Sequence, residues 1–316
     1  MTRRAGVGLM LLAGLVPARA QSLQYEYLFT LGTGAGVNPP QRFSHGFGKL
    51  FFGRPERPSP VGVPSAVAVD PDERIWIADR GQPSVHMFDL LRNRYWVLRG
   101  AGKSPFRCPT GIDSDQAGVI YVADACAGKI LLFDRDGSFL RALPGDSAWP
   151  VQPWSVRVRP DRKVIYVSDP TRHRVVVFNQ EGESIGALGR PGDLEFPTAL
   201  ALDPPAKRIL VLDAARRRVQ AFSWNGNWQQ SLSWSQVREP SAFVFDPEQR
   251  RYFLGDPRYE TVQVFDEEGF SVGFFGQQGS GLEELRTPTA LYVDFRQRIY
   301  VVDSLNGKVV VFREKP

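Results

Sequence analysis

The hydrophobic and polar positions of this chain alternate in short bursts, and no stretch of useful length keeps a helical period. Residues 65–69 (SAVAV) and 75–78 (IWIA) are short, apolar and partly β-branched, which is typical of buried strands. Between them, residues 70–73 (DPDE) favour a type I turn. Further strands are expected at residues 85–88 and 95–98. The pattern therefore predicts four antiparallel strands joined by short turns and loops.

The same order of strands recurs six times along the chain. Each unit begins at a proline, and successive units are 45, 44, 44, 43 and 48 residues apart, starting at Pro64, Pro109, Pro153, Pro197, Pro240 and Pro288. An aspartate ends the second strand of every unit: Asp79, Asp124, Asp169, Asp213, Asp256 and Asp303. A phenylalanine follows each of these second-strand aspartates by nine residues: Phe88, Phe133, Phe178, Phe222, Phe265 and Phe312. Units of this kind are typical of β-propeller blades.

The two ends of the chain are expected to meet in the last blade. The sixth unit stops directly after its third strand, and residues 24–31 (QYEYLFTL) resemble the outer strands of other units. We therefore predict an all-β, six-bladed β-propeller of four-stranded antiparallel blades, in which the N-terminal strand closes the last blade. The propeller spans residues 64–316, and its closing strand lies within residues 21–31. The insertion at residues 32–63 either caps the disk or forms an exposed interaction loop.

Two units carry the residues of a known repeat family. The second unit reads PTGI…GVIYVAD…GKILLFD, and the sixth reads PTAL…RIYVVDSLNGKVVVF. Both resemble NHL repeats, and the resemblance covers roughly residues 64–312 and the closing strand. It is weakest in the fifth unit, where Gly255-Asp256 replaces the apolar-Ala-Asp ending. NHL propellers are mostly platforms for ligands or partner proteins, so the resemblance implies a binding role by analogy of fold.

The N-terminus has the parts of a secretory signal peptide. A basic start is followed by a 12-residue apolar run (5–16) and by the small-x-small sequence ARA at residues 18–20. We expect residues 1–20 to be removed and the mature protein to be periplasmic or secreted. The segment contains three arginines and no acid, so removal takes Lys+Arg from 39 to 36 against 34 Asp+Glu and the net charge from +5 to +2. The pair Arg3-Arg4 leaves Sec and twin-arginine export both open.

Composition narrows the class of protein further. The 316-residue chain is 42% hydrophobic and 23% charged, which excludes a disordered chain. Beyond the N-terminus no apolar run approaches 18 residues, so we expect no membrane span. The small net charge of the mature chain and its export argue against a nucleic-acid partner. We expect a monomer.

The chain has two cysteines, and export would allow them to form a disulfide. Cys108 directly precedes the first strand of the second unit, and Cys126 lies in the loop between its second and third strands. In a four-stranded antiparallel blade both positions lie on one face, within reach of each other. Some members of the NHL family carry a similar bridge. We therefore predict a Cys108–Cys126 disulfide.

The second-strand aspartates would lie together on one face of the disk, called here the Asp79 face. A ring of carboxylates is a candidate set of cation ligands. Alternatively, each carboxylate accepts hydrogen bonds from its own loop and pairs with a basic residue five positions on, found at Lys129, Arg174, Arg218 and Lys308. The recurring basic residue favours the second interpretation. We expect no cofactor, and the one candidate is a structural cation in the central channel.

Related six-bladed propellers include metal-dependent enzymes, namely the peptide-amidating lyase and the lactonases similar to gluconolactonase. The lyase needs several histidines on one metal, whereas this chain has His45, His86 and His173, none of them near the start of an inner strand. The lactonases use Glu, Asn and Asp in the channel. The six inner strands here contain neither Glu nor Asn, and Asp113 and Arg157 are their only charged residues. A divergent metal-dependent lyase or lactonase is therefore the alternative to a non-catalytic protein.

Basic and aromatic residues gather in the loops expected on the Asp79 face. Arginine and tryptophan are the residues that binding surfaces favour. The candidate binding face consists of Arg80, Arg107, Trp149, Trp154, Arg172, Arg216 and Arg258. Its predicted partner is an acidic protein surface or an anionic glycan. The sequence thus predicts an exported, non-catalytic scaffold of the bacterial envelope.

Overall fold

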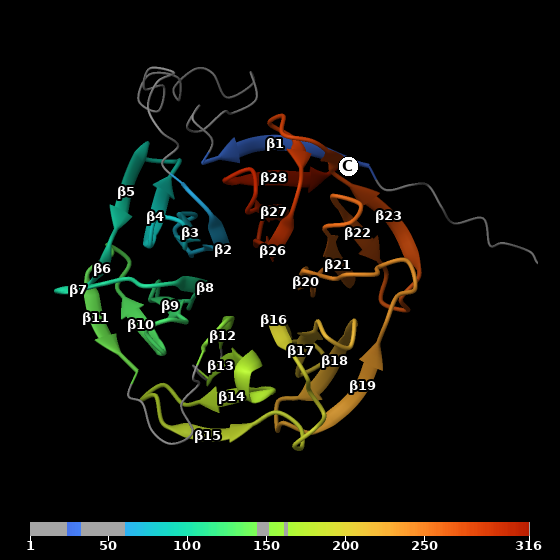
Figure 1. The fold of residues 1–316 in the computed structure, drawn as a ribbon, viewed down its shortest axis with the longest axis horizontal. Coiled ribbons are helices and arrows are strands. Elements are labelled where there is room, and N and C mark those ends of the chain that lie inside the picture. Colours follow the sequence, from blue (N-terminus) through green and yellow to red (C-terminus); the bar gives the residue numbers. More distant parts are fainter. Residues whose placement is uncertain (1–23, 33–60, 144–151, 161–163, 316) are drawn as a thin grey trace, which may run out of the picture.

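A computed structural model describes residues 24–32, 61–143, 152–160 and 164–315 of the protein. The expected signal peptide, most of the insertion and Trp149 lie outside these residues. The described chain is nearly all β and forms six four-stranded antiparallel sheets arranged in a ring (Figure 1). This confirms the predicted six-bladed β-propeller. No helix in the described ranges is long and apolar enough to cross a membrane.

Blades 1 to 3 follow one another along the chain, each running from an inner to an outer strand. Blade 1 contains β2 (Pro64–Val69), β3 (Ile75–Asp79), β4 (Ser84–Asp89) and β5 (Arg94–Leu98). Blade 2 contains β8 (Pro109–Ser114), β9 (Ile120–Asp124), β10 (Lys129–Phe133) and β11 (Phe139–Ala142). Blade 3 contains β12 (Val156–Arg159), β13 (Val164–Asp169), β14 (Arg174–Phe178) and β15 (Ser184–Ala187), with the 3₁₀ turn η2 (Pro170–Arg172) after β13.

Blades 4 to 6 repeat this order, and short strand pairs join two of the blades to their successors. Blade 4 contains β16 (Pro197–Asp203), β17 (Arg208–Asp213), β18 (Arg218–Ser223) and β19 (Trp228–Leu232). Blade 5 contains β20 (Ala242–Asp246), β21 (Arg251–Asp256), β22 (Thr261–Phe265) and β23 (Ser271–Phe275). Blade 6 contains β26 (Pro288–Val293), β27 (Arg298–Asp303), β28 (Lys308–Glu314) and β1 (Tyr25–Leu31). The linker pairs are β6 (Gly100–Ala101) with β7 (Ser104–Pro105), and β24 (Gln277–Gln278) with β25 (Glu284–Leu285).

The N-terminal strand closes the ring, as the sequence predicts. β1 pairs antiparallel with β28 from Tyr25 opposite Glu314 to Leu31 opposite Val309 (Figure 1). The Thr30 hydroxyl also donates to the carbonyl of Leu282, 2.7 Å away, in the linker that precedes blade 6. Blade 6 is therefore built from both ends of the described chain, and β28 has no open edge.

The repeated phenylalanines form the packing between blades. Phe88, Phe133, Phe178, Phe222 and Phe265 are at most 1% exposed, and Phe312 is 5% exposed. Between blades 1 and 2, for example, Phe133 packs in one cluster with Trp76 and Phe106. Because adjacent sheets bury this apolar surface against each other, the hydrophobic effect holds the blades in the ring.

The turns at the inner-strand ends are stabilised by a second set of aspartates, on the face opposite the Asp79 face. Asp70 is fully buried and accepts hydrogen bonds from the backbone of Arg74, from its guanidinium group and from the Trp76 indole. Asp294 accepts the equivalent bonds from Arg298 and from the Tyr300 hydroxyl. These aspartates stabilise the turns, so their recurrence along the chain has a structural role at this face.

Substituting Leu31 tests how much ring closure contributes to stability. Leu31 is fully buried with Phe29, Val61 and Val309, so Leu31→Ala removes packed atoms and leaves a cavity. The free energy of unfolding in urea is expected to fall by roughly 2–5 kcal/mol. The matched variant Leu140→Ala, on the exposed outer strand β11, is expected to change it by less than about 0.5 kcal/mol. Equal effects of the two variants would contradict the closing role of β1.

Candidate functional site

The second-strand aspartates bind the protein's own backbone. All six are at most 1% exposed. In five of the blades the carboxylate accepts N–H groups from the residues just before the first strand: Asp79 from Gly62 and Val63, Asp124 from Arg107 and Cys108, Asp213 from Glu195 and Phe196, Asp256 from Arg238, and Asp303 from Arg286 and Thr287. Each carboxylate thereby ties the chain entering a blade to its second strand, as predicted for local hydrogen bonding.

Asp79 shows how strongly this arrangement favours the charged carboxylate. It accepts four backbone N–H groups, and its Oδ2 lies 3.3 Å from Nε2 of His86. Burial alone raises the pKa of Asp79, but the hydrogen bonds from His86 and the backbone outweigh it and lower the pKa to about 2. His86 is itself buried, and its Nδ1 lies 2.8 Å from the Tyr95 hydroxyl. This histidine is a packed partner of the loop.

The basic residues five positions on lie opposite the aspartates in the sheet register. An ion pair forms in blade 3, where Arg174 Nε is 3.6 Å from Asp169 Oδ2. Lys308 instead donates from Nζ to the carbonyls of Gly281 and Leu282, and burial lowers the pKa of its amine. The predicted pairing is therefore confirmed at Arg174, while Lys308 anchors a linker.

The predicted disulfide joins Cys108 and Cys126, whose Cα atoms are 5.2 Å apart. The backbone supports the bridge, because Cys108 donates to Asp124 and Ala125 donates to the Cys108 carbonyl. The cysteines are 18 residues apart in the sequence, and closing a loop of this size stabilises the fold by about 3 kcal/mol in the chain-entropy description. The bridge fixes the linker that enters blade 2 to the Asp79 face.

A groove beside the disulfide brings together two of the predicted binding residues, Arg80 and Trp154. It has a volume of about 390 Å³ and is lined by Arg80, both cysteines, Gln152 and Trp154. Blades 1, 2 and 3 each contribute to it. Arg80 is exposed and Trp154 is half-buried, so a guanidinium group and an indole both reach this hollow. The groove is called here the Arg80–Trp154 groove.

The remaining predicted residues lie in loops of the same face but not in this groove. Arg107 is exposed next to Cys108, Arg172 is exposed in η2, and Arg258 is exposed between β21 and β22. Arg216 lies 3.3 Å from a carboxylate oxygen of Glu195 and donates to backbone carbonyls of the loop before blade 4. Its charge is therefore used within the protein, whereas Arg80, Arg107 and Arg258 expose their side chains on this face.

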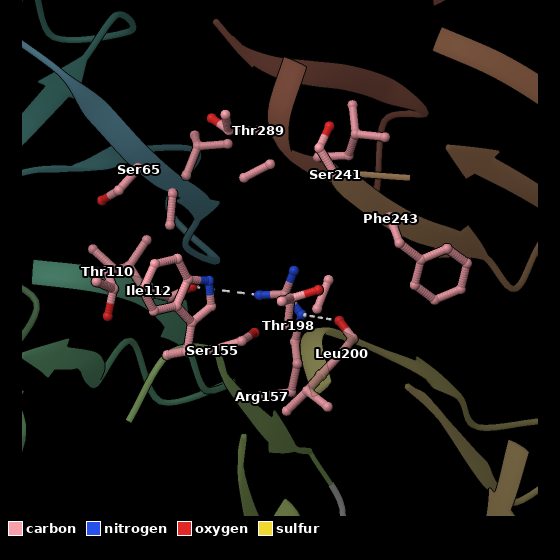
Figure 2. Close-up of a pocket in the computed structure, with 17 residues that line it drawn as sticks. Ser65, Thr110, Ile112, Ser155, Arg157, Thr198, Leu200, Ser241, Phe243 and Thr289 are labelled. Carbon is pink, nitrogen blue, oxygen red and sulfur yellow. Dashed lines mark hydrogen bonds between the residues drawn. The ribbon is translucent and has the colours of Figure 1, made fainter. Parts of the chain in front are cut away.

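A second hollow lies at the mouth of the central channel on this face (Figure 2). The residue after each repeat proline faces it, and most of these residues carry a hydroxyl group: Ser65, Thr110, Thr198, Ser241 and Thr289. Ser65 donates to the Pro109 carbonyl at 2.7 Å and Thr110 to the Pro153 carbonyl at 3.0 Å, which links blade 1 to blade 2 and blade 2 to blade 3. A Cβ on Gly111 would lie 2.6 Å from the Trp154 carbonyl, so glycine allows blades 2 and 3 to approach here.

Arg157 extends across the channel below this mouth (Figure 2). From blade 3 its Nε donates to the Leu200 carbonyl of blade 4 at 3.1 Å, and its Nη1 donates to the Ile112 carbonyl of blade 2 at 3.4 Å. Nη1 also lies 3.6 Å from the Asp113 carboxylate, and the guanidinium carbon is 5.5 Å from the Tyr292 ring of blade 6. Burial raises the pKa of Asp113 and Arg157 opposes this shift. One cationic side chain thus connects four blades.

The channel residues do not fit a metal ion. Asp113 accepts the backbone N–H of Val158 at 2.8 Å and faces the guanidinium of Arg157, so its carboxylate already has partners. A guanidinium group repels a metal ion placed beside it. In the described ranges no three His, Cys, Asp or Glu side chains gather as a ligand set. His173 lies in the loop after η2, and its ring contacts the Glu195 carbonyl.

Sequence reasoning missed the role of the channel residues. It identified Arg157 as a charged exception among the inner strands, yet the partners of this side chain come from blades 2, 4 and 6. The hydroxyl after the repeat proline was a visible signal, because it recurs in five of the six units as Ser65, Thr110, Thr198, Ser241 and Thr289. Its regular spacing could have predicted a polar channel mouth.

No protein-family model and no curated protein sequence matches the chain. Solved structures do. A gluconolactonase from Xanthomonas campestris superposes with a TM-score of 0.64 at 15% identity, covering 81% of this chain and 87% of that one. A chain of a nidogen/laminin complex gives 0.60 at 18% identity, covering 80% and 93%. A virginiamycin B lyase from Staphylococcus aureus gives 0.58 at 12% identity, covering 80% and 84%.

These neighbours are six-bladed β-propeller proteins of the NHL and gluconolactonase type, and they include enzymes as well as a binding protein. At such low identities the likeness shows the fold alone. The chain therefore shares the β-propeller fold with these proteins, and its chemistry has to be argued from its own residues.

The low pKa of Asp79 predicts a measurable pH dependence of stability. Its carboxylate is charged in the native state down to about pH 2, whereas an unfolded aspartate has a pKa near 3.9. Asp79 therefore stabilises the fold above about pH 4, and this contribution, about 2 kcal/mol, is lost as the pH falls through the native pKa. Asp79→Asn should lose less stability between pH 4 and pH 2 than the wild type in urea denaturation.

The exposed Glu239 provides the control for this experiment, because Glu239→Gln removes a carboxyl group that has no such partners. The stability of Glu239→Gln should change with pH as that of the wild type does. A curve for Asp79→Asn that runs parallel to the wild type would contradict the proposed anchoring of the linker by Asp79.

Proposed function

We propose that this protein is an exported, non-catalytic propeller that binds an acidic partner through the Asp79 face. The observation that carries the proposal is the Arg80–Trp154 groove. There an exposed guanidinium group and a half-buried indole line one hollow of about 390 Å³. Arginine binds carboxylates through geometrically matched hydrogen bonds, and tryptophan provides a large flat contact surface.

The rigidity of the groove supports a binding role. The Cys108–Cys126 disulfide lies in its lining, and hydrogen bonds to Asp79 and Asp124 hold Val63 and Cys108, which also line it. A surface that is held in shape before binding loses little conformational entropy when a partner docks. The exposed Arg107 and Arg258 extend the positive charge beyond the groove.

Export is part of the proposal and rests on two features of the chain. The first 20 residues have the composition of a cleavable signal peptide. The described chain forms a disulfide, and such bonds persist mainly in oxidising compartments such as the periplasm. We therefore assign the protein to the bacterial envelope or the exterior.

The alternative function is that of a divergent metal-dependent lyase or lactonase. The resemblance of the fold to such enzymes is the reason to consider it. A catalytic metal needs several free ligands and an open position. In this channel Arg157 places a positive charge against the Asp113 carboxylate. The donor set therefore favours the binding function over the enzymatic one.

Binding of an acidic polymer tests the groove directly. We expect the mature protein to bind polyglutamate or polygalacturonate, measured by calorimetry at low salt. Arg80→Gln combined with Trp154→Ala should weaken binding by at least about tenfold, because it removes both the charge and the flat contact. Added salt should weaken wild-type binding as well, because exposed charges are screened.

The matched control carries the same two substitutions outside the groove. Arg135→Gln with Trp228→Ala changes an arginine in the opposite-face turn of blade 2 and an exposed indole on β19. This variant should bind like the wild type. Binding of neither polymer by the wild type, or equal loss in both double variants, would overturn the proposal.

Metal dependence separates the two functions. We expect dialysis against EDTA, followed by addition of calcium, magnesium or zinc, to leave the thermal unfolding midpoint unchanged. The Asp113 carboxylate already accepts the Val158 N–H and faces the Arg157 guanidinium, so it is not available as a ligand for an added ion. A midpoint that falls with EDTA and recovers with one of these metals would favour the enzyme instead.

A further inference from the structure

A further hollow lies on the outer rim of the propeller, where blade 3 meets blade 4. It lies between the end of β15 and the turn that leads into β19 (Figure 1), and its volume of about 350 Å³ is typical of small-molecule sites. Its lining consists of Gly189, Arg190, Asp193, Gly226, Asn227 and Trp228. None of these residues lines the Arg80–Trp154 groove or the channel mouth. The site is called here the Trp228 hollow.

Trp228 exposes its ring to solvent although it is a residue of a blade. It begins the outer strand β19, lies opposite Phe222 in the sheet register and is 52% exposed. Phe139 holds the equivalent place in blade 2, and its ring packs against Phe133 with 5.8 Å between the ring centroids. The more exposed indole of Trp228 offers a flat aromatic surface to a ligand.

A buried glutamine fixes the indole relative to the opposite wall of the hollow. The indole N–H of Trp228 donates to Oε1 of Gln220 at 2.8 Å, and Nε2 of Gln220 donates to the Asp193 carbonyl at 2.6 Å. Gln220 is only 1% exposed, so these bonds are shielded from water. The backbone joins the same two walls, because the Gly189 N–H donates to the Gly226 carbonyl at 2.8 Å. The indole and the facing loop are thus held in position before a ligand binds.

The polar side chains beside the indole can hydrogen-bond a ligand. Arg190 and Asn227 are exposed, and no described residue pairs with the guanidinium of the first or the side-chain amide of the second. Oδ2 of Asp193 accepts the backbone N–H of Arg190 at 2.7 Å, whereas Oδ1 accepts no hydrogen bond from the described residues. The lining therefore offers both donors and acceptors. Its one guanidinium and one carboxylate leave it without net charge.

We propose that the Trp228 hollow binds a sugar ring of an uncharged glycan. The C–H groups on one face of a pyranose ring carry partial positive charge and stack on the electron-rich face of an indole. The hydroxyl groups at the edge of the sugar both donate and accept hydrogen bonds, as Arg190, Asp193 and Asn227 do on the protein side. Because the charges of the lining cancel, an acidic sugar gains no net attraction there.

A peptide side chain fits this lining less well than a sugar. The hollow is lined by two glycines, three polar side chains and one indole, and by no aliphatic side chain. Protein partners insert apolar side chains into the centre of an interface, which requires an apolar pocket. The combination of one flat ring with several hydrogen-bonding groups favours a polyhydroxylated ligand.

Three neutral tetrasaccharides test the site: cellotetraose, maltotetraose and chitotetraose. At least one of them should cause saturable changes in the indole N–H NMR signal of Trp228, which is assigned by its loss in Trp228→Ala. In calorimetry Trp228→Ala should weaken binding of that glycan by at least about tenfold, because the stacking surface is removed. Trp228→Phe keeps an aromatic face and should retain part of the affinity.

Asn227→Ala tests the hydrogen-bonding part of the site without affecting the fold, because no described residue binds the exposed amide. It should weaken glycan binding about fivefold, as expected for one lost hydrogen bond. The matched control is Tyr259→Ala. Tyr259 is 51% exposed, nearly as much as Trp228, but lies outside the hollow, so this variant should bind like the wild type.

Three results would overturn the proposal. They are the absence of saturable shifts with all three glycans, equal affinity losses in Trp228→Ala and Tyr259→Ala, and saturable shifts of the Trp228 signal with a tryptic digest of albumin but with none of the glycans. The test does not depend on the acidic partner of the Arg80–Trp154 groove. Arg80→Gln with Trp154→Ala should leave glycan binding unchanged, and Trp228→Ala should leave polyglutamate binding unchanged.

Discussion

The antiparallel pairing of β1 with β28 is the interaction on which every other feature of the propeller depends. It brings residues from opposite ends of the described chain into one sheet, from Tyr25 with Glu314 to Leu31 with Val309. Only a closed ring places the six inner strands around a common axis, and only then do residues of blades 2, 3, 4 and 6 meet in the channel. The hydrophobic packing between blades supplies most of the stabilisation, while the closing strand determines where that packing begins and ends.

The aspartate repeat explains how the loops of the Asp79 face are held in fixed positions. In five of the blades the entering linker is bound to a buried carboxylate, and in blade 2 the disulfide adds a covalent tie to the same linker. The carboxylates are therefore occupied by the backbone, and the exposed arginines determine the charge that this face presents to solvent. The proposed binding surface and the framework thus use different residues at neighbouring positions.

Much of the fold could be predicted from the sequence, because each blade repeats the same local signals. The proline, the second-strand aspartate and the phenylalanine nine residues later correspond to blade entry, linker anchor and buried core. The Cys108–Cys126 bridge also followed from strand order.

The contacts of the candidate site were less predictable. Arg157, Lys308 and Arg216 bind carbonyl groups that are 45, 27 and 24 residues away at their most distant, and these partners depend on how blades and linkers lie in space. Neither hydrophobic periodicity nor residue spacing encodes such contacts.

The topology of blade 6 also has a kinetic consequence. Since Tyr25 pairs with Glu314, β1 finds its neighbour only after the strands of all six blades have been made. Until then blade 6 lacks its outer strand and the ring stays open. Contacts of such long sequence separation form slowly. The interval between synthesis and completion of the ring is the period in which this protein is most exposed to proteases and to self-association.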